Sequence, residues 1–298
     1  MPGRTVNRRV RKRAVALARL LVFVLLVFVA LPAKRHWLRG VLHDNGGVMS
    51  YVIDHMIDLA AVLAFSGIVA AIERRPFAAF GLPLRQALGA RFWQGAAVGM
   101  ASLVVLVFGL RLVGALDVRA PATPALEMAG YGIGYAVLLV LLATCEEFLY
   151  RGYGLFTLTE ATTFWFAAVA STVWFTWTHS GPHENWIGLA SVLLFGLLAC
   201  LTLRRTGNLW LALGFHAAWN WGQTFLFGVS DSGHATVPGH FFTSTVSPSA
   251  PVWLSGGPVG PEGSALCAVI LVLLWIACAW LPRGIHYPIS AGTEATVE

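Results

Sequence analysis

The chain has 298 residues, of which 57% are hydrophobic and only 11% are charged. Soluble domains carry about 25% charged residues, so this composition excludes an ordinary soluble protein and indicates a polytopic membrane protein. The net charge of +6 would suit binding to nucleic acid, but the placement of the charges argues against that partner. Six basic residues fall in the first thirteen positions, beside an apolar run, where they act as a topology signal or contact anionic lipid head groups.

Eight apolar segments of helical length follow one another along the chain. They cover residues 14–32, 48–72, 92–115, 126–158, 164–180, 187–203, 207–228 and 264–282. This pattern predicts an all-α fold with about eight transmembrane helices. The Lys and Arg residues divide fifteen to five between the two sides of such a bundle, which predicts a multi-pass protein of the cell membrane with both termini in the cytoplasm.

The segments group into five regions. These are a basic cytoplasmic tail (1–13), N-terminal transmembrane helices (14–125), a core that carries the polar motifs (126–228), a loop (229–263), and a last helix with a cytoplasmic tail (264–298). The loop is rich in Gly, Pro, Ser and Thr, so we expect it to be flexible and extracytoplasmic. The first segment is either a retained helix or a signal peptide, and the absence of a good cleavage site at its end favours the retained helix.

Small residues recur on one face of the third segment. Gly95, Gly99 and Ser102 lie three or four residues apart, so they share a helix face. Small residues at this spacing let two membrane helices approach closely. The pattern therefore predicts a tight contact between this helix and another.

Three charged residues interrupt the fourth segment. Glu146, Glu147 and Arg151 follow directly on the apolar run 135–143. A charge in the bilayer core costs roughly 2.5–3.5 kcal/mol on insertion scales, so the group either marks where the helix leaves the membrane or has a function. Glu147 and Arg151 lie four residues apart and can pair, whereas Glu146 points about 100° away and is left for chemistry.

Further polar groups lie inside two later segments. His179 ends the fifth segment one turn after Phe175, whose ring could pack against the imidazole. His216 and Asn220 lie four residues apart in the seventh segment and share a helix face. A lone histidine in an apolar helix is more often a packing residue, but several polar groups on three helices favour a functional cluster.

These polar groups can meet if the fourth and fifth segments form a hairpin. With a turn near 160–163, Glu146 and His179 lie roughly 21 and 24 Å from the turn, at 1.5 Å per residue. His216 lies roughly 14 Å into its own helix, so tilt or a shorter connecting loop must supply the rest. A fourth helix that ended at Arg151 would leave Glu146 and His179 on opposite sides of the bilayer, and we exclude that arrangement.

A carboxylate, two imidazoles and a carboxamide suit the hydrolysis of an amide bond. Glu146 could take a proton from water as a general base, and histidine and asparagine donors can hold the oxyanion of a tetrahedral intermediate. The same set could bind Zn²⁺ through His179, His216 and a glutamate, although the HExxH motif is absent. Neither a GxSxG motif nor a suitably placed serine supports a serine mechanism.

The polar motifs, in this order and inside membrane helices, resemble a known family. Glu146-Glu147-xxx-Arg151, Phe175-xxx-His179 and His216-xxx-Asn220 are similar to the motifs of the CAAX prenyl protease and bacteriocin-processing (CPBP, or Abi) family of intramembrane proteases. The resemblance covers about residues 126–228. It implies an all-helical membrane endopeptidase that cleaves a peptide bond near a membrane-embedded or lipidated segment.

The resemblance also implies roles for the polar residues. Glu146 would activate water with His179, and His216 with Asn220 would support the oxyanion. The candidate catalytic set is Glu146, Glu147, His179, His216 and Asn220, with Arg151 as a structural partner. The family has been described as metalloproteases and as metal-independent glutamic proteases. Asparagine in place of a third strong ligand favours no required cofactor, and Zn²⁺ on Glu146, His179 and His216 is the alternative.

Two other functions fit a polar cluster in a membrane bundle. One is a non-proteolytic immunity or binding protein in which the cluster only stabilises packing, and the other is a proton-coupled transporter. The complete set of motif residues favours the protease over the first, and the absence of inverted-repeat symmetry disfavours the second. The expected partners are the lipid bilayer and a membrane-associated peptide or protein.

Reporter fusions test the predicted orientation. Fusions after Ser232 and after Ala291 should report opposite compartments, because the eighth segment separates these positions and the basic residues place the C-terminal tail in the cytoplasm. Paired reporters, one active only outside the cytoplasm and one only inside, make the measurement. If both fusions report the same compartment, either the eighth segment does not span the membrane or the eight-helix arrangement as a whole is wrong.

Overall fold

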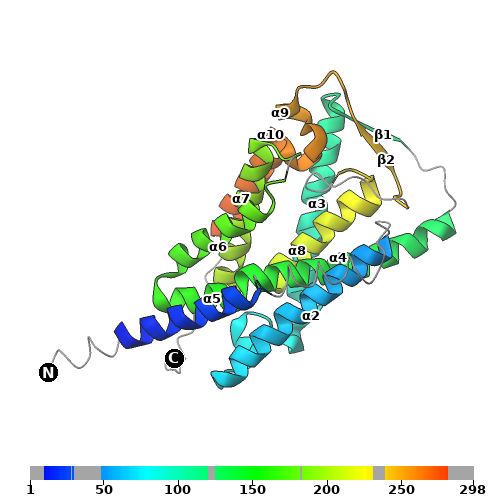
Figure 1. The fold of residues 1–298 in the computed structure, drawn as a ribbon. Helices are drawn as coiled ribbons and strands as arrows, with labels where there is room; N and C mark the ends of the chain where they lie inside the picture. The colour runs from blue at the N-terminus through cyan, green and yellow to red at the C-terminus, as the bar shows by residue number, and fades with distance from the viewer. Residues whose placement is uncertain are drawn as a thin grey trace.

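Helices build almost all of the structure, which is a computed structural model. It describes residues 10–27, 29, 48–119, 125–181, 183–230 and 239–280. The side chains of 48–55, 77 and 125–127 are not described. The basic residues before position 10, the end of the first segment at 30–33, part of the predicted loop at 231–238 and the tail after 280 lie outside the described residues. Residues 10–27 form the first helix, which lies along α5 in Figure 1.

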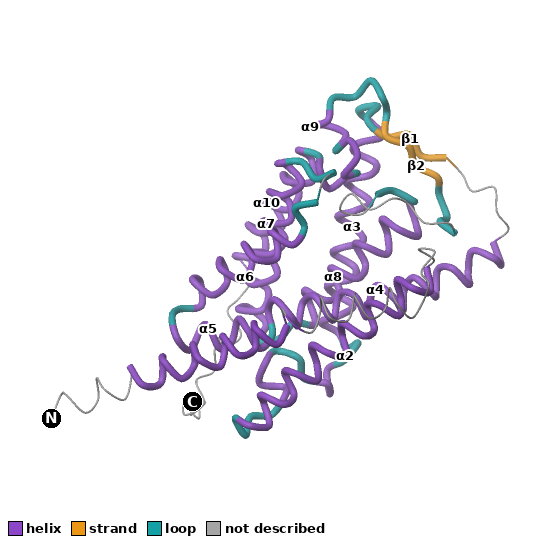
Figure 2. The backbone as a smooth tube through the Cα atoms, in the orientation of Figure 1, coloured by secondary structure: helices purple, strands orange, loops and turns teal. Residues whose placement is uncertain are grey.

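The remaining elements follow in chain order (Figures 1 and 2). The helices are α2 (Val48–Ile72), α3 (Ala90–Leu112), α4 (Ala125–Arg151), α5 (Tyr153–Ala161), α6 (Phe164–Thr178), α7 (Trp186–Thr206), α8 (Trp210–Trp221), the π-helix η3 (Gly222–Phe227), α9 (Val252–Ser255) and α10 (Ala265–Trp280). Short 3₁₀ turns are η1 (Phe77–Phe80), η2 (Leu84–Gln86), η4 (Gly257–Val259) and η5 (Pro261–Gly263). The prediction of an all-α fold is confirmed.

Three described helices are long and apolar enough to cross a membrane. They are Ala90–Leu112, Met128–Ala161 and Trp186–Thr206, and Met56–Ile72 and Ala265–Trp280 are shorter apolar helices. Each of the eight predicted segments coincides with a helix in the described part of the chain. Helices α6 and α8 are shorter than a bilayer is thick, since 15 residues span only about 22 Å. The chain is thus a helical membrane protein, as its composition predicts.

The long helix of the fourth segment breaks at Gly152. Helix α4 does end at Arg151, contrary to the sequence analysis, but α5 begins two residues later and carries the chain on to Ala161. The break needs glycine because a Cβ at position 152 would lie 2.3 Å from the carbonyl oxygen of Phe148. Helix α6 then starts at Phe164, capped by Thr163, so the predicted hairpin turn is confirmed, and Glu146 and His179 lie close enough to line one cavity.

Helices α3 and α8 pack backbone against backbone. A Cβ at Gly95 would lie 2.0 Å from the carbonyl oxygen of Leu211, and a Cβ at Gly99 would lie 2.5 Å from that of Phe215. From the other side, a Cβ at Gly214 would lie 2.0 Å from the carbonyl oxygen of Phe92. The close contact predicted from the small residues is therefore confirmed, and α8 is its partner. Because His216 and Asn220 are on α8, this contact sets where they lie.

A two-stranded antiparallel ribbon joins two connections that the sequence analysis left irregular. Strand β1 (Leu116–Arg119) pairs with β2 (Thr243–Val246), at the end of the molecule where α9 also lies (Figure 2). Residues 239–263, expected to form a flexible loop, instead contain β2, α9 and the turns η4 and η5. Strands of four residues are too short to give a periodic signal, so only their pairing reveals them.

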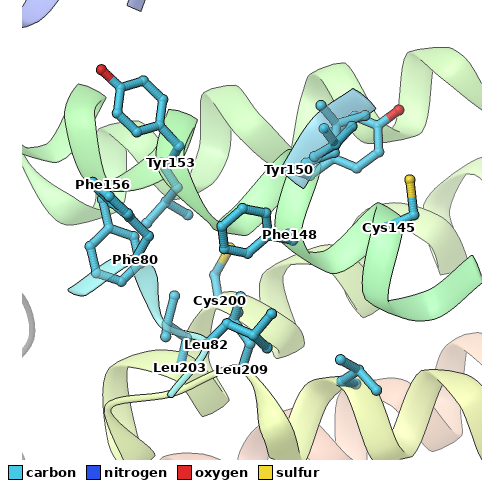
Figure 3. Packing of buried hydrophobic residues seen from close by; sticks show 14 of the residues in the cluster. Phe80, Leu82, Cys145, Phe148, Tyr150, Tyr153, Phe156, Cys200, Leu203 and Leu209 are labelled. Atoms are coloured by element: carbon cyan, nitrogen blue, oxygen red, sulfur yellow. The ribbon is translucent and has the colours of Figure 1, made fainter. Parts of the chain in front are cut away.

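A hydrophobic cluster packs around the junction of α4 and α5. Figure 3 shows Tyr153 and Phe156 beside Phe80, Phe148 near buried leucines of other elements, and Tyr150 on the side of Cys145. The rings of Phe80 and Tyr153 meet edge to face, with centroids 5.1 Å apart. Burial of this cluster on both sides of Gly152 holds α4 and α5 in one direction, so the break does not become a turn.

A Cβ placed between α3 and α8 should weaken the bundle. Gly95→Ala should lower the stability of the purified protein by about 1–3 kcal/mol, because the helices must separate to admit the methyl group. The measurement is thermal denaturation in detergent, followed by size-exclusion chromatography. Gly134→Ala on α4 is the matched control, since nothing lies within 4 Å of its added Cβ. Equal stability of the two variants would show that the close contact is not required.

Candidate functional site

A fully buried ion pair lies behind the site. On α4, Nη1 of Arg151 donates to Oε1 of Glu147 over 3.0 Å, and both side chains have no exposed surface. The pair predicted from the spacing of four residues is therefore confirmed. Two charges removed from water are tolerated only when they compensate each other, so each residue requires the other.

Aromatic rings enclose the guanidinium of Arg151. Its central carbon lies 4.2 Å from the ring centroid of Phe175 and 5.8 Å from those of Phe195 and Tyr150. Gly196 on α7 leaves the space for it, because a Cβ there would lie 2.8 Å from Nη2 of Arg151. The negative faces of the rings add to the compensation of the charge and bring α4, α6 and α7 together around it.

Glu147 also holds His216. Oε1 of Glu147 lies 3.0 Å from Nδ1 of His216, and since a carboxylate only accepts, Nδ1 carries the proton. The other ring nitrogen, Nε2, faces Oε2 of Glu146 at 3.6 Å. Glu147 thus orients the imidazole from behind, and Glu146 lies on its open side. The two adjacent glutamates point in different directions, as the helix geometry predicts.

His179 lies at the C-terminal end of α6. Its Nδ1 donates to the backbone carbonyl of Phe175 over 2.8 Å, and its ring lies beside that of Phe175, with centroids 4.3 Å apart. The predicted packing between these two residues is confirmed. With Nδ1 protonated, a neutral His179 carries its lone pair on Nε2, where it can accept a hydrogen bond.

Four of the predicted residues line one cavity with a volume of about 100 Å³. They are Glu146 from α4, His179 from α6, and His216 and Asn220 from α8. Apolar side chains of α6, α7, α8 and α10 form most of the remaining wall; among them are Phe175, Val192, Phe195, Phe215, Trp219 and Leu271. A partly exposed carboxylate, two imidazoles and a carboxamide therefore share one largely apolar space. Glu147 and Arg151 do not line it.

Two polar residues of the cavity wall were not among the predicted site residues. Ser191 comes from α7 and Glu262 from η5, in the segment expected to be a flexible loop. Nε1 of Trp219 donates to Oε1 of Glu262 over 2.8 Å. No motif surrounds either residue, and only the packing of η5 against α7 and α10 brings Glu262 to the cavity.

The proposed zinc ligands do not form a ligand group. Among the described residues, no three or more His, Cys, Asp or Glu side chains are arranged to hold a metal ion. Nδ1 of His216 is bonded to Glu147 and Nδ1 of His179 to the carbonyl of Phe175, so each imidazole has only Nε2 left to offer to the cavity. The described part of the chain thus shows no formed zinc group, and Zn²⁺ on Glu146, His179 and His216 stays the alternative to a metal-free site.

Residues 128–222 match a family model described as Type II CAAX prenyl endopeptidase Rce1-like. The match runs from near the beginning of α4 to the end of α8, and it includes all seven named residues of the motifs. It confirms the resemblance to CPBP proteins over this part of the chain. The matched part ends before η5, so Glu262 lies outside it. No curated protein matches the chain.

Loss of the buried cation should reduce the amount of folded protein. Arg151→Ala leaves the carboxylate of Glu147 buried without its partner, which typically costs about 3–5 kcal/mol. We expect lower yield and lower thermal stability in detergent, measured against Arg85→Ala, a change at an exposed arginine. Normal abundance and stability combined with lost activity would instead indicate a direct chemical role for Arg151.

Proposed function

We propose that this protein is an intramembrane endopeptidase that hydrolyses a peptide bond of a membrane-associated or lipidated protein or peptide. The observation that carries the proposal is the cavity in which Glu146, His179, His216 and Asn220 converge from three helices. Similarity of residues 128–222 to CAAX-type endopeptidases supports the same reaction. The proposed setting is the cell membrane, with both chain termini in the cytoplasm.

In the proposed reaction, Glu146 is the general base. Its carboxylate takes a proton from a water molecule while the oxygen of that water attacks the carbonyl carbon of the substrate. His179 accepts a hydrogen bond from the same water through Nε2 and so helps to orient it. The proton held by Glu146 then passes to the amine nitrogen as the carbon–nitrogen bond breaks, which regenerates the carboxylate.

His216 and Asn220 are the proposed oxyanion donors. One helical turn separates them on α8, so Nε2 of His216 and the side-chain amide of Asn220 can both donate to the same substrate oxygen. Nε2 donates when His216 carries a proton on both nitrogens, and the carboxylates on either side stabilise that form. Donors fixed in a water-poor cavity stabilise a developing negative charge without reorganising at the moment of reaction.

We assign Glu147 a positioning role. Although it stands next to Glu146 in the sequence, its side chain is fully buried and does not line the cavity. It bonds Arg151 on one side and His216 on the other, so it fixes the ring orientation and the tautomer of His216. Within the predicted catalytic set, Glu147 is therefore the residue that acts by orienting His216.

Replacing the base should abolish turnover without changing the fold. Glu146→Gln keeps the shape of the side chain but cannot hold the proton, so cleavage of membrane-anchored peptides should fall below detection at normal abundance. Asn220→Ala should lose roughly 100- to 1,000-fold in turnover, the usual cost of one oxyanion donor. Proteomics of membrane-anchored peptides, from cells that make each variant, identifies and quantifies the products.

Glu160→Gln is the matched control for this experiment, since Glu160 pairs with Arg75 near the protein surface and does not line the cavity. It should behave as wild type. Products that persist in the Glu146→Gln cells would exclude the proposed base. If wild-type cells yield no products at all, a non-proteolytic binding role becomes the better explanation.

We also propose that the reaction requires no metal. Wild-type protein stripped with a strong chelator, and shown to be metal-free by elemental analysis, should retain its peptidase activity because the proposed base and oxyanion donors all belong to the chain. Loss of activity on stripping, recovered with one equivalent of Zn²⁺, would replace this mechanism with a metalloprotease.

A further inference from the structure

The cavity wall contains a second polar group that the proposed reaction does not use. Glu262 on η5 and Ser191 on α7 line the same cavity as Glu146, and Cys267 of α10 neighbours both. None of the proposed steps needs these side chains. A carboxylate in an apolar, partly buried wall is costly to desolvate, so its presence there calls for a reason.

The backbone around Glu262 is tied to the bundle at several points. The side-chain amide of Asn185, which caps α7, donates to the carbonyls of Gly256 and Gly263 over 3.2 and 3.4 Å. The oxygen of the same side chain accepts from the first backbone N–H groups of α7. Gly256 has a φ of +82°, and a Cβ there would lie 1.7 Å from the carbonyl of Gly260. This clasp, residues 256–263, holds η5 in a defined place over the cavity.

The side chain of Glu262 is also held at its tip. Oε1 accepts a hydrogen bond of 2.8 Å from Nε1 of Trp219, and the ring of Trp219 stacks on that of Phe215, with centroids 5.6 Å apart and planes 16° apart. Trp219 is the neighbour of Asn220 and lies one turn after His216 on α8. The carboxylate is therefore coupled to the helix that carries both proposed oxyanion donors.

Ser191 adds an orphaned hydroxyl to the same wall. Its side chain is 3% exposed, and its oxygen has no nitrogen or oxygen partner among the described residues. The neighbouring thiol of Cys267 is at most a weak partner. A buried hydroxyl with only a weak partner costs free energy unless water or a ligand completes it, so this wall can receive a polar group of a substrate.

We propose that Glu262, Ser191 and Trp219 form a subsite that accepts a basic side chain, Lys or Arg, of the peptide substrate. Glu262 supplies the opposite charge, and the hydroxyl of Ser191 supplies a further acceptor for the N–H groups of the cation. The methylene stem of such a side chain suits the apolar wall of Val192 and Leu271. This inference rests on the proposed peptidase function and specifies its substrate class.

The same geometry places the basic residue close to the cleaved bond. Residues three and four apart on a helix are neighbours, so Trp219 lies beside His216 on α8. An extended peptide advances about 3.3–3.6 Å per residue, and Glu262 lines the same small cavity, about 100 Å³, as Glu146. The selected residue therefore lies within about two positions of the cleaved bond.

A peptide library with purified full-length protein in nanodiscs tests the subsite. The probe is a mixture of quenched fluorescent peptides that vary at the four positions on each side of the cleaved bond. The wild type should prefer Lys or Arg at one position within two residues of that bond. The best Lys peptide and its norleucine twin, which keeps the stem but lacks the charge, then serve as the measured pair.

Glu262→Gln should weaken use of the Lys peptide about tenfold to a hundredfold more than use of its norleucine twin, mostly through KM, since the lost interaction is a charge-assisted bond. The glutamine oxygen can still accept from Trp219, so the clasp is retained. Glu262→Arg should shift the preference toward an acidic residue at that position. Glu160→Gln, at a glutamate outside the cavity, should keep the wild-type ratio.

The outcomes separate this subsite from the peptidase activity. Cleavage by the wild type without any basic preference, or an equal loss for both peptides in Glu262→Gln, overturns the subsite and leaves the proposed function standing. An equal loss would mean that Glu262 only supports Trp219. A wild type that cleaves no library member, exactly like Glu146→Gln, counts against the proposed function and the subsite together.

Discussion

The site depends on one buried electrostatic chain, Arg151–Glu147–His216. An arginine with no exposed surface inside an apolar bundle is tolerable only because a carboxylate and aromatic rings compensate its charge. The same carboxylate oxygen then holds the imidazole that faces Glu146. Glu147 therefore contributes both to stability and to the proposed chemistry, because its carboxylate neutralises Arg151 and also orients His216.

Helix α8 is the element on which the other parts of the site converge. Glycines let it lie against the backbone of α3, His216 joins it to α4, and Trp219 joins it to η5. The π-helix η3 follows directly after Trp221, and wider turns of this kind often occur beside functional sites. A shift of α8 would move both proposed oxyanion donors together, so its close packing would serve the proposed chemistry as well as the fold.

The cavity is built from two kinds of sequence. Its proposed catalytic groups lie within the part that is similar to CAAX-type endopeptidases, whereas Glu262 comes from a segment outside that part. The proposed catalytic groups lie on helices, whereas a connecting segment supplies part of the cavity wall. In such an arrangement, substrate selectivity can change without disturbing the catalytic groups. The proposed subsite follows this division.

The sequence by itself determined the helical membrane fold, the Glu147–Arg151 pair, the shared face of His216 and Asn220, and the small-residue face of α3. All of these follow from spacing along one helix or from the cost of placing charge in lipid, which are local properties. Only the tertiary structure decided that Glu147 faces away from the cavity, that residues 239–263 are ordered by β1 and Asn185, and that Glu262 reaches the site. These features depend on contacts between residues far apart in the chain, and no local pattern encodes which distant groups will meet.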